Sequence, residues 1–189
     1  MVQIASRIAE QDIRKAVVAR LLADAGSGDR IVEELGVGSA RIDVALISGQ
    51  LSGFEIKSDY DTLDRLARQM HAYHCVFDDL TIVTTAAYAL QVEQLLPKWW
   101  GIWIAQAHGD ASIELQIHRE STRHDRLDAL SLAAMLWREE AYRFVVEHLG
   151  TVVRPRASRG ELQELIAAKL PLELICQEVL RILRDREVL

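Results

Sequence analysis

The sequence predicts an α/β fold in which a mixed β-sheet is flanked by helices and followed by an all-helical C-terminal region. Over residues 1–120, short apolar runs rich in Ile, Val and Thr alternate with helical stripes, and these runs outnumber what a helical bundle would allow. From about residue 125 the apolar spacing is helical throughout. We therefore divide the chain into a core at residues 1–120 and a helical accessory region at residues 121–189.

An amphipathic helix opens the predicted core, and a β-hairpin follows it. The apolar stripe of the helix consists of Ile13, Val17, Leu21 and Leu22. The helix is expected to end near the glycines of residues 26–28. Residues 31–35 fit either a short helix or a strand. Residues 41–57 predict two strands, because strand formers flank the turn residues Ser48-Gly49-Gln50.

A helix with two distinct faces is expected after the hairpin. Asp61 is its predicted N-cap, with Asp64 three residues later. Its buried stripe is predicted to consist of Leu63, Leu66, Met70 and Phe77. Arg65, Gln69 and Tyr73 recur at a spacing of four, so they share another face of the helix.

Three more strands and one helix complete the predicted core. The strands are expected at residues 80–83, 102–105 and 113–117. A helix over roughly residues 86–96 lies between the first two of these strands and ends at Pro97. A turn at Gly109-Asp110 is expected to join the last two.

Three helices are expected in the C-terminal region. One long stripe, which ends at Gly150, consists of Leu127, Leu130, Ala134, Trp137, Ala141, Phe144 and Val145. Ser158 and Glu161 have the spacing of a capping box at the start of the second helix. Pro171 fits the opening of the last helix, which runs through Leu183.

Two acids and a lysine are spaced along the hairpin so that they converge. If residues 48–50 are the loop, the register places Glu55 opposite Asp43, with Cβ atoms about 4.5 to 5.5 Å apart. The two-residue period of a strand puts Lys57 on the same face as Glu55. Carboxylate oxygens suit Mg²⁺ or Mn²⁺, and a lysine beside them could orient a water or stabilise developing charge. The alternative is an ordinary hairpin with polar residues on its exposed face.

Two motifs around the hairpin extend beyond these three residues. They are Arg41-Ile42-Asp43-Val44-Ala45 and Gly53-Phe54-Glu55-Ile56-Lys57-Ser58-Asp59, followed by a helix that carries Gln69. This combination resembles the PD-(D/E)xK nuclease superfamily. Residues 55–66, in which Glu-Ile-Lys-Ser-Asp precedes Asp-Thr-Leu-Asp-Arg-Leu, resemble a small bacterial and phage branch of it. The close resemblance spans about residues 30–104 and implies a restriction-endonuclease-like fold that hydrolyses DNA phosphodiester bonds with Mg²⁺ or Mn²⁺.

The resemblance also implies a set of metal ligands. Asp43 and Glu55 would bind the metal, and the carbonyl of Ile56 would add a ligand. An upstream acid is expected as well. Glu34 is preferred over Glu33, and whether the segment is a helix or a strand decides which of the two points inward.

By the same resemblance, Lys57 would be the catalytic lysine and Gln69 would contact a water or a phosphate. Ile42 departs from the superfamily pattern, in which a proline precedes the first acid of the hairpin. The alternative function is a catalytically silent nuclease-fold module that binds nucleic acid or a protein partner in phage and host conflict. The intact set of acids and lysine favours the enzyme.

The formal net charge of −6 is unusual for a protein that binds nucleic acid. Residues 1–120 carry 11 Lys and Arg against 17 Asp and Glu, whereas residues 121–189 carry 11 of each kind. Several acids of the core belong to the predicted metal site, where bound cations would reverse the local field. The charge therefore leaves DNA open as a substrate but argues against tight nonspecific binding by the core alone.

Six basic residues are candidates for nucleic-acid contacts: Arg41, Arg65, Lys98, Arg154, Arg156 and Arg159. The last three lie in a predicted exposed linker, for which the alternative is a solvated loop that closes a helical cap. Lys98 precedes Trp99-Trp100, which could stack on a base, although tryptophans are more often part of a core. DNA is the expected partner, RNA stays open, and the sequence allows a homodimer.

The cysteines and the hydropathy predict an ordinary reduced protein. Cys75 and Cys176 sit in helical patterns and suggest neither a disulfide framework nor a zinc cage. His71-x-x-His74-Cys75 lacks the distant partner that a tetrahedral zinc site needs. No apolar run approaches the 18 or so residues of a membrane helix, and the N-terminus carries charges where a signal peptide would be apolar. We expect a soluble, cytoplasmic protein without a membrane partner.

Overall fold

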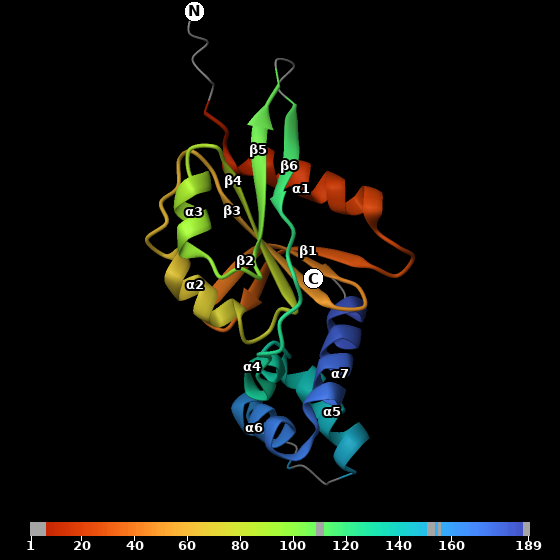
Figure 1. Ribbon diagram of the computed structural model, residues 1–189. Coiled ribbons are helices and arrows are strands. Elements are labelled where there is room, and N and C mark those ends of the chain that lie inside the picture. Colours follow the sequence, from red (N-terminus) through yellow and green to blue (C-terminus); the bar gives the residue numbers. More distant parts are fainter. Residues whose placement is uncertain (1–6, 109–111, 151–153, 155, 187–189) are drawn as a thin grey trace, which may run out of the picture.

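A computed structural model describes residues 7–108, 112–150, 154 and 156–186 (Figure 1). Its strands form one mixed sheet in the order β1-β2-β3-β4-β5-β6. The strands are β1 (Arg30–Val37), β2 (Ala40–Ile47), β3 (Leu51–Lys57), β4 (Asp79–Thr85), β5 (Gly101–Ala107) and β6 (Ile113–Arg119). Neighbours pair antiparallel from β1 to β3 and again between β5 and β6, whereas β3, β4 and β5 run parallel. The predicted α/β class and mixed sheet are confirmed, and the segment 31–35 is a strand.

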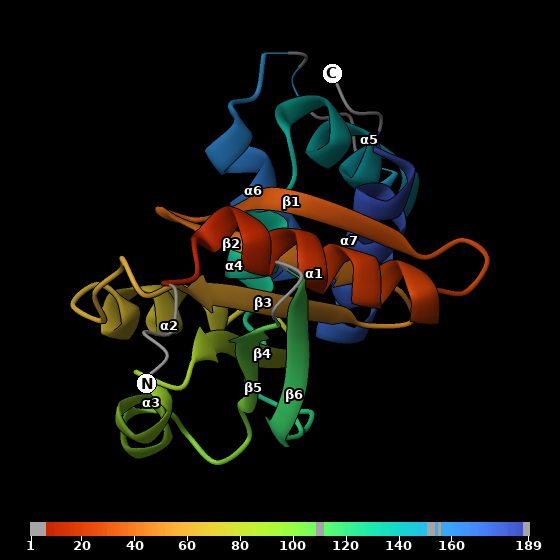
Figure 2. The same ribbon diagram turned by 90° about the horizontal axis from the view of Figure 1, so that it is seen from above.

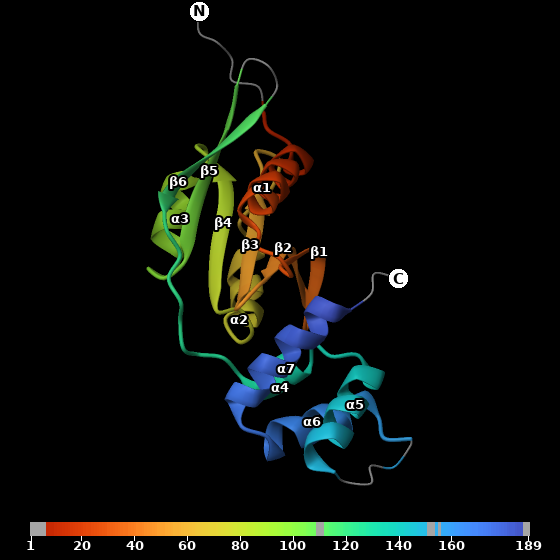
Figure 3. The same cartoon turned by 90° about the vertical axis from the view of Figure 1, so that its right-hand side faces the viewer.

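Helices cover both faces of the sheet, as Figures 2 and 3 show. Helix α1 (Glu10–Asp24) lies on one face, while α2 (Leu66–Tyr73) and α3 (Ala89–Leu95) lie on the other. The α1 face buries Ile13, Val17, Leu21, Val44, Phe54, Ile56, Val83 and Ala105 in one apolar cluster. Leu22, predicted to belong to this stripe, is instead 63% exposed. No helix among the described residues is long and apolar enough to cross a membrane.

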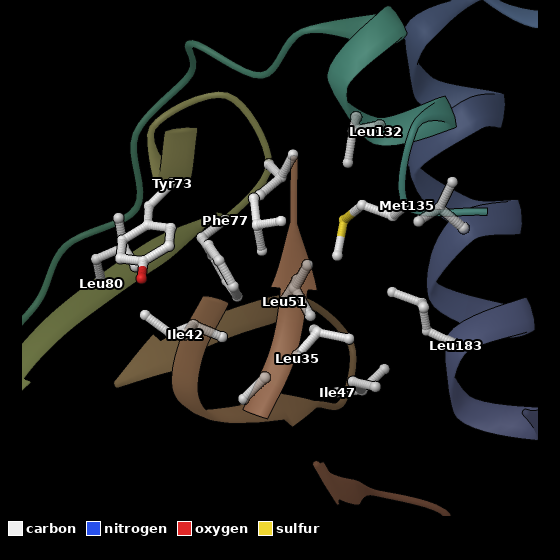
Figure 4. Close-up of a cluster of buried hydrophobic side chains, with 14 of the residues drawn as sticks. Leu35, Ile42, Ile47, Leu51, Tyr73, Phe77, Leu80, Leu132, Met135 and Leu183 are labelled. Atoms are coloured by element: carbon white, nitrogen blue, oxygen red, sulfur yellow. The ribbon is translucent and has the colours of Figure 1, made fainter. Parts of the chain in front are cut away.

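The C-terminal helices share a core with the other face of the sheet. They are α4 (Ala129–Ala133), α5 (Arg138–Leu149), α6 (Arg159–Lys169) and α7 (Leu172–Asp185). In Figure 4, Met135 and Leu183 of this region point toward Leu35, Ile47 and Leu51 of the sheet. The helical accessory region is therefore joined to the core by continuous apolar packing.

The C-terminal helices differ in one respect from the prediction. The stripe from Leu127 to Val145 is not one helix, because the chain breaks between α4 and α5. The backbone N–H of Trp137 donates to Glu140 Oε2 at 2.7 Å, so a new helix start is stabilised inside the predicted stripe. The capping box of Ser158 and Glu161 is confirmed, as is Pro171 at the start of α7.

The predicted helix start at Asp61 is wrong. Asp61 Oδ2 accepts the backbone N–H of Ser58 at 2.9 Å and its hydroxyl at 2.5 Å, so the carboxylate closes a local turn instead of capping a helix. Helix α2 begins at Leu66 and ends at Tyr73, before Phe77. The turn predicted at residues 109–110 lies outside the described residues.

Gly53 permits the close approach of β3 to its neighbours. A Cβ atom at this position would lie 2.7 Å from Leu80 Cδ2 and 3.0 Å from the ring of Phe77. Both neighbours are fully buried in the core, so neither can move away freely. A glycine is therefore required in the middle of the strand that carries Glu55 and Lys57.

Candidate active site

The hairpin of β2 and β3 positions the acids and the lysine. Its ladder pairs Ile47 with Leu51 and continues to Val44 with Phe54, which is the predicted register. Where the next step would bring Asp43 opposite Glu55, Asp43 Oδ2 instead accepts the backbone N–H of Ile56 at 2.6 Å. The carboxylate is thus fixed at the edge of β3.

Alternation along β3 separates the catalytic candidates from the core residues. Phe54 and Ile56 are buried in the cluster under α1. Glu55 and Lys57 therefore face the opposite side of the sheet, toward α2. Both are nearly inaccessible to solvent, with 1% of the Glu55 side chain and 7% of the Lys57 side chain exposed.

Glu55 is held by three side chains. Its Oε1 atom accepts from Lys57 Nζ at 2.6 Å and from Gln69 Nε2 at 2.7 Å. Its Oε2 atom lies 2.9 Å from the hydroxyl of Tyr73, which is also 2.6 Å from the carbonyl oxygen of Arg41. Burial, followed by the charge of Glu55, raises the pKa of Tyr73, so this residue acts as a neutral hydrogen-bond donor. Gln69 lies where the sequence predicted it, whereas the contact of Tyr73 was not foreseen.

Asp43 carries an electrostatic cost in the folded protein. Burial, followed by the negative charge of Glu55, raises its pKa from 3.8 to about 7. The hydrogen bond from Ile56 and the charges of Lys57 and Arg14 act in the opposite direction. Two carboxylates are therefore held near each other with incomplete neutralisation.

A break in the β1–β2 ladder lies beside Asp43. The strands pair on both sides of the position at which Glu34 would face Asp43, but not at that position itself. Glu34 has a φ of 56°, and among the described residues it is the one non-glycine residue with positive φ. The break also disturbs alternation in β2, because Ile42 and Val44 are buried in clusters on opposite faces of the sheet. Backbone strain is thus concentrated where two acids meet.

Arg14 lies among these acids, although the sequence did not single it out. Its Nη2 atom is 2.5 Å from Glu34 Oε1, 3.2 Å from Asp43 Oδ1 and 2.6 Å from Glu10 Oε1. Glu33 is more distant, with Oε2 3.9 Å from Arg14 Nη1. The spacing of Glu10 and Arg14 predicts an ion pair along a helix. The same spacing does not indicate that this helix lies against the hairpin.

The site opens into a cleft of about 690 Å³. The predicted residues that line it are Glu34, Arg41, Asp43, Glu55, Ile56, Lys57, Arg65 and Gln69. Glu10, Arg14 and Arg68 line it as well. Arg41, Arg65 and Arg68, here called the rim arginines, are exposed, so three cationic groups border the same cleft as the acids.

Lys98 and the tryptophans beside it do not line this cleft. Trp100 is fully buried, and its Nε1 donates to His74 Nε2 at 2.9 Å. Burial lowers the pKa of His74 to about 4, so this ring is a neutral acceptor. Trp99 is half-buried and packs on His124, with ring centroids 4.0 Å apart. The core interpretation therefore holds for Trp100.

The C-terminal arginines also lie outside the cleft. Arg159 was predicted as a nucleic-acid contact in an exposed basic linker that leads into the capping box of the next helix. It is exposed and begins α6, and its guanidinium donates to the carbonyl oxygens of Leu136 at 2.9 Å and Ala134 at 2.5 Å. Arg154 and Arg156, here called the linker arginines, are exposed, and Arg154 pairs with Glu161 at 2.7 Å. Arg159 thus joins helices of the accessory region.

A second group of potential metal ligands lies between α5 and α7. Glu147, His148 and Glu178 each offer a ligand atom, and these atoms lie within 4.8 Å of one another. Arg181 already approaches Glu178 to 2.6 Å and Glu147 to 3.8 Å. We therefore interpret this group as an ion-pair network that connects the two helices.

The fold and the site define an α/β protein with an acid, acid and lysine cleft on two neighbouring strands, β2 and β3, of a mixed sheet. The chain belongs to the bacteriophage P4 protein cII family, whose model matches residues 4–187. It is similar to Protein cII of Enterobacteria phage P4, with 27% identity over 186 residues, which is 97% of this chain and 69% of that protein. Among solved structures, a protein of unknown function from Silicibacter pomeroyi has a TM-score of 0.47 and 20% identity, covering 78% of this chain and 97% of that one. None of these descriptions names an activity.

Proposed function

We propose that this protein is a metal-dependent deoxyribonuclease that hydrolyses DNA phosphodiester bonds. The observation that carries the proposal is that Asp43 of β2 and both Glu55 and Lys57 of β3 line one cleft. A buried lysine held against a buried glutamate is costly for stability alone, because desolvation offsets much of the attraction between the charges. A catalytic role accounts for that cost. The resemblance to PD-(D/E)xK nucleases supports the same activity.

The donor chemistry fits Mg²⁺ or Mn²⁺. Asp43, Glu55 and Glu34 contribute carboxylate oxygens to the cleft, and the backbone carbonyl of Ile56 is a further candidate ligand. Asp43 Oδ1 is not used by the hydrogen bond from Ile56, which goes to Oδ2. When bound, the cation would lower the pKa of a coordinated water and neutralise charge that develops on the phosphate. Glu34 is preferred to Glu33, since Glu34 lines the cleft.

The ammonium of Lys57 is held in a fixed position in the cleft. Its ammonium is 2.6 Å from Glu55 Oε1 and 3.4 Å from Gln69 Oε1, so two partners fix its position. From there it can donate to a water or to a phosphate oxygen at the cleft. Gln69 bonds to both Glu55 and Lys57, and it acts as a positioning residue for the pair.

The rim arginines support a polyanionic substrate. They come from two elements, β2 and the start of α2, on which they border the same cleft. Guanidinium groups bind phosphate oxygens in a bidentate manner, so these three residues can hold a phosphate backbone at the cleft. DNA is proposed as the substrate, and RNA is the alternative that the test below addresses.

The proposal is tested by incubating the protein with labelled single-stranded DNA, duplex DNA, branched DNA and RNA in Mg²⁺, Mn²⁺ or EDTA. We expect cleavage of at least one DNA substrate that depends on the metal and is lost in Glu55→Gln. Asp12→Asn, on the exposed side of α1, is the matched control and should keep the activity. Equal cleavage by the parent and by Glu55→Gln, or cleavage of RNA alone, would contradict the proposal.

A second candidate is a module that binds nucleic acid or a protein without hydrolysing anything. The observation in its favour is the position of Arg14, which partly neutralises Glu34 and Asp43 without a metal. Thermal unfolding with and without Mn²⁺ separates the two candidates. Stabilisation by Mn²⁺ supports the metal site, because only a ligand that binds the folded state raises its stability. DNA binding with neither Mn²⁺ stabilisation nor cleavage would favour the module.

A further inference from the structure

Arg14 occupies a central position among the acids of the cleft. One guanidinium nitrogen, Nη2, lies within 3.2 Å of carboxylate oxygens from α1, β1 and β2, which belong to Glu10, Glu34 and Asp43. Nη1 of the same group also donates to the backbone carbonyl of Asp43 at 3.3 Å. Only 15% of the Arg14 side chain is exposed. A single cationic group therefore connects three elements at the point where acids accumulate.

The particular oxygens that Arg14 contacts make its role specific. Asp43 has one oxygen, Oδ2, tied to the backbone N–H of Ile56. Its other oxygen, Oδ1, is the one that faces Arg14. Glu34 likewise directs Oε1 to Arg14, and Oε2 toward Arg41 at 3.5 Å. The oxygens best placed to accept a cation are therefore those that the guanidinium already contacts.

We propose that Arg14 is a displaceable counter-ion of the metal centre, which neutralises Asp43 and Glu34 in the metal-free protein and leaves them when a divalent cation binds. This inference rests on the proposed function. An arginine suits the role because it stays charged and has five donors, so one side chain can bridge several carboxylates. Glu10, one turn before Arg14 on α1, retains the guanidinium when Asp43 releases it.

The role of Arg14 can be recognised from the metal affinity of the protein without it. A residue that merely holds the acids in place would weaken metal binding when it is removed. A competitor does the opposite, because its removal frees the carboxylates and leaves them more negative. Removal of Arg14 should therefore destabilise the metal-free protein and strengthen metal binding at the same time.

The test compares Arg14→Gln with Arg20→Gln by calorimetric titration of Mn²⁺ at pH 8. Arg20 is a matched control, because it lies on the same helix and pairs with Asp24 at 3.0 Å in the same i,i+4 spacing, but it is exposed. Both variants lose one positive charge, so a general charge effect would appear in both. We expect Arg14→Gln to bind Mn²⁺ about tenfold more tightly than the parent, the equivalent of about 1.4 kcal/mol, and Arg20→Gln to match the parent. In EDTA, the urea midpoint should fall for Arg14→Gln more than for Arg20→Gln.

Arg14→Lys keeps the charge and serves if Arg14→Gln does not fold. Because an ammonium is a point charge without the planar fork, we expect its Mn²⁺ affinity to lie between those of the parent and Arg14→Gln. Unchanged or weaker Mn²⁺ binding in the Arg14 variants, beside measurable binding by the parent, would overturn this inference and leave the proposed function intact. Absence of Mn²⁺ binding in the parent would overturn both.

Discussion

Replacing Asp43 by asparagine should remove a pH dependence from the stability of the metal-free protein. The pKa of Asp43 is raised from 3.8 to about 7 in the folded state, so the folded protein binds this proton more tightly than the unfolded chain does. The stability gained from that proton is complete below about pH 4 and is lost as the pH rises through about 7. The carboxamide of the variant has no such proton to lose.

The magnitude follows from the two pKa values. The whole difference corresponds to at most about 4 kcal/mol, and the part that falls between pH 5 and pH 8 to at most about 3 kcal/mol. The attraction of Arg14 is already contained in the folded-state pKa, so it is not subtracted a second time. The carboxamide oxygen of the new side chain can still accept from Ile56. We therefore expect Asp43→Asn to be more stable than the parent at pH 8 in EDTA, by at most about 4 kcal/mol.

Urea unfolding in EDTA at several pH values between 5 and 8 measures this difference directly. The parent should lose stability relative to Asp43→Asn as the pH rises, while the exposed control Asp12→Asn should follow the parent. Adding Mn²⁺ at pH 8 should stabilise the parent and the control but not Asp43→Asn. Parallel pH profiles for the parent and Asp43→Asn would refute the claim that burial and the charge of Glu55 raise the pKa of Asp43 in the folded protein.

Three further predictions concern the lysine, the arginines and the strand that carries the site. Lys57→Ala should lower turnover by about 100-fold or more while Mn²⁺ binding survives, because an ammonium is not a metal ligand. Loss of Mn²⁺ binding would instead indicate a structural role for Lys57. Lys15→Ala is the exposed control. Alanine at all three rim arginines should weaken duplex DNA binding and reduce the slope of log affinity against log salt concentration by up to about 0.9 per lost phosphate contact. Alanine at both linker arginines should change neither the affinity nor the slope. The reverse result would place the DNA path on the accessory region. Gly53→Ala should destabilise the protein by about 1 to 3 kcal/mol in urea unfolding, and unaltered stability would mean that β3 is not packed as closely as described.

Most of what positions the site could be predicted from sequence because it depends on local patterns. The loop at residues 48–50 determined the hairpin register as far as the pair of Val44 and Phe54, one step before Asp43 and Glu55. The two-residue period placed Lys57 beside Glu55, whereas the place of Gln69 near the site was implied by the resemblance to PD-(D/E)xK nucleases. The register and the alternation need only the geometry of one hairpin.

The parts that could not be predicted depend on tertiary packing. Nothing in the pattern of α1 shows that Arg14 reaches Asp43 on β2, since that contact exists only because α1 crosses the hairpin. The strained backbone at Glu34 arises from a ladder break that no turn residue marks in the sequence. The bonds of the Arg159 guanidinium could not be predicted either, because its acceptors, the carbonyl oxygens of Leu136 and Ala134, are 23 and 25 residues away in sequence.

The most direct test of the central claim is a crystal structure of the protein grown with Mn²⁺, with anomalous diffraction data to locate the ion. The claim is that Asp43 and Glu55 form a metal centre beside Lys57. We predict one anomalous peak within ligand distance of the Asp43 and Glu55 carboxylates. A crystal grown at saturating Mn²⁺ that shows no anomalous peak at these two residues would contradict the claim. Mn²⁺ bound only elsewhere on the chain would contradict it as well.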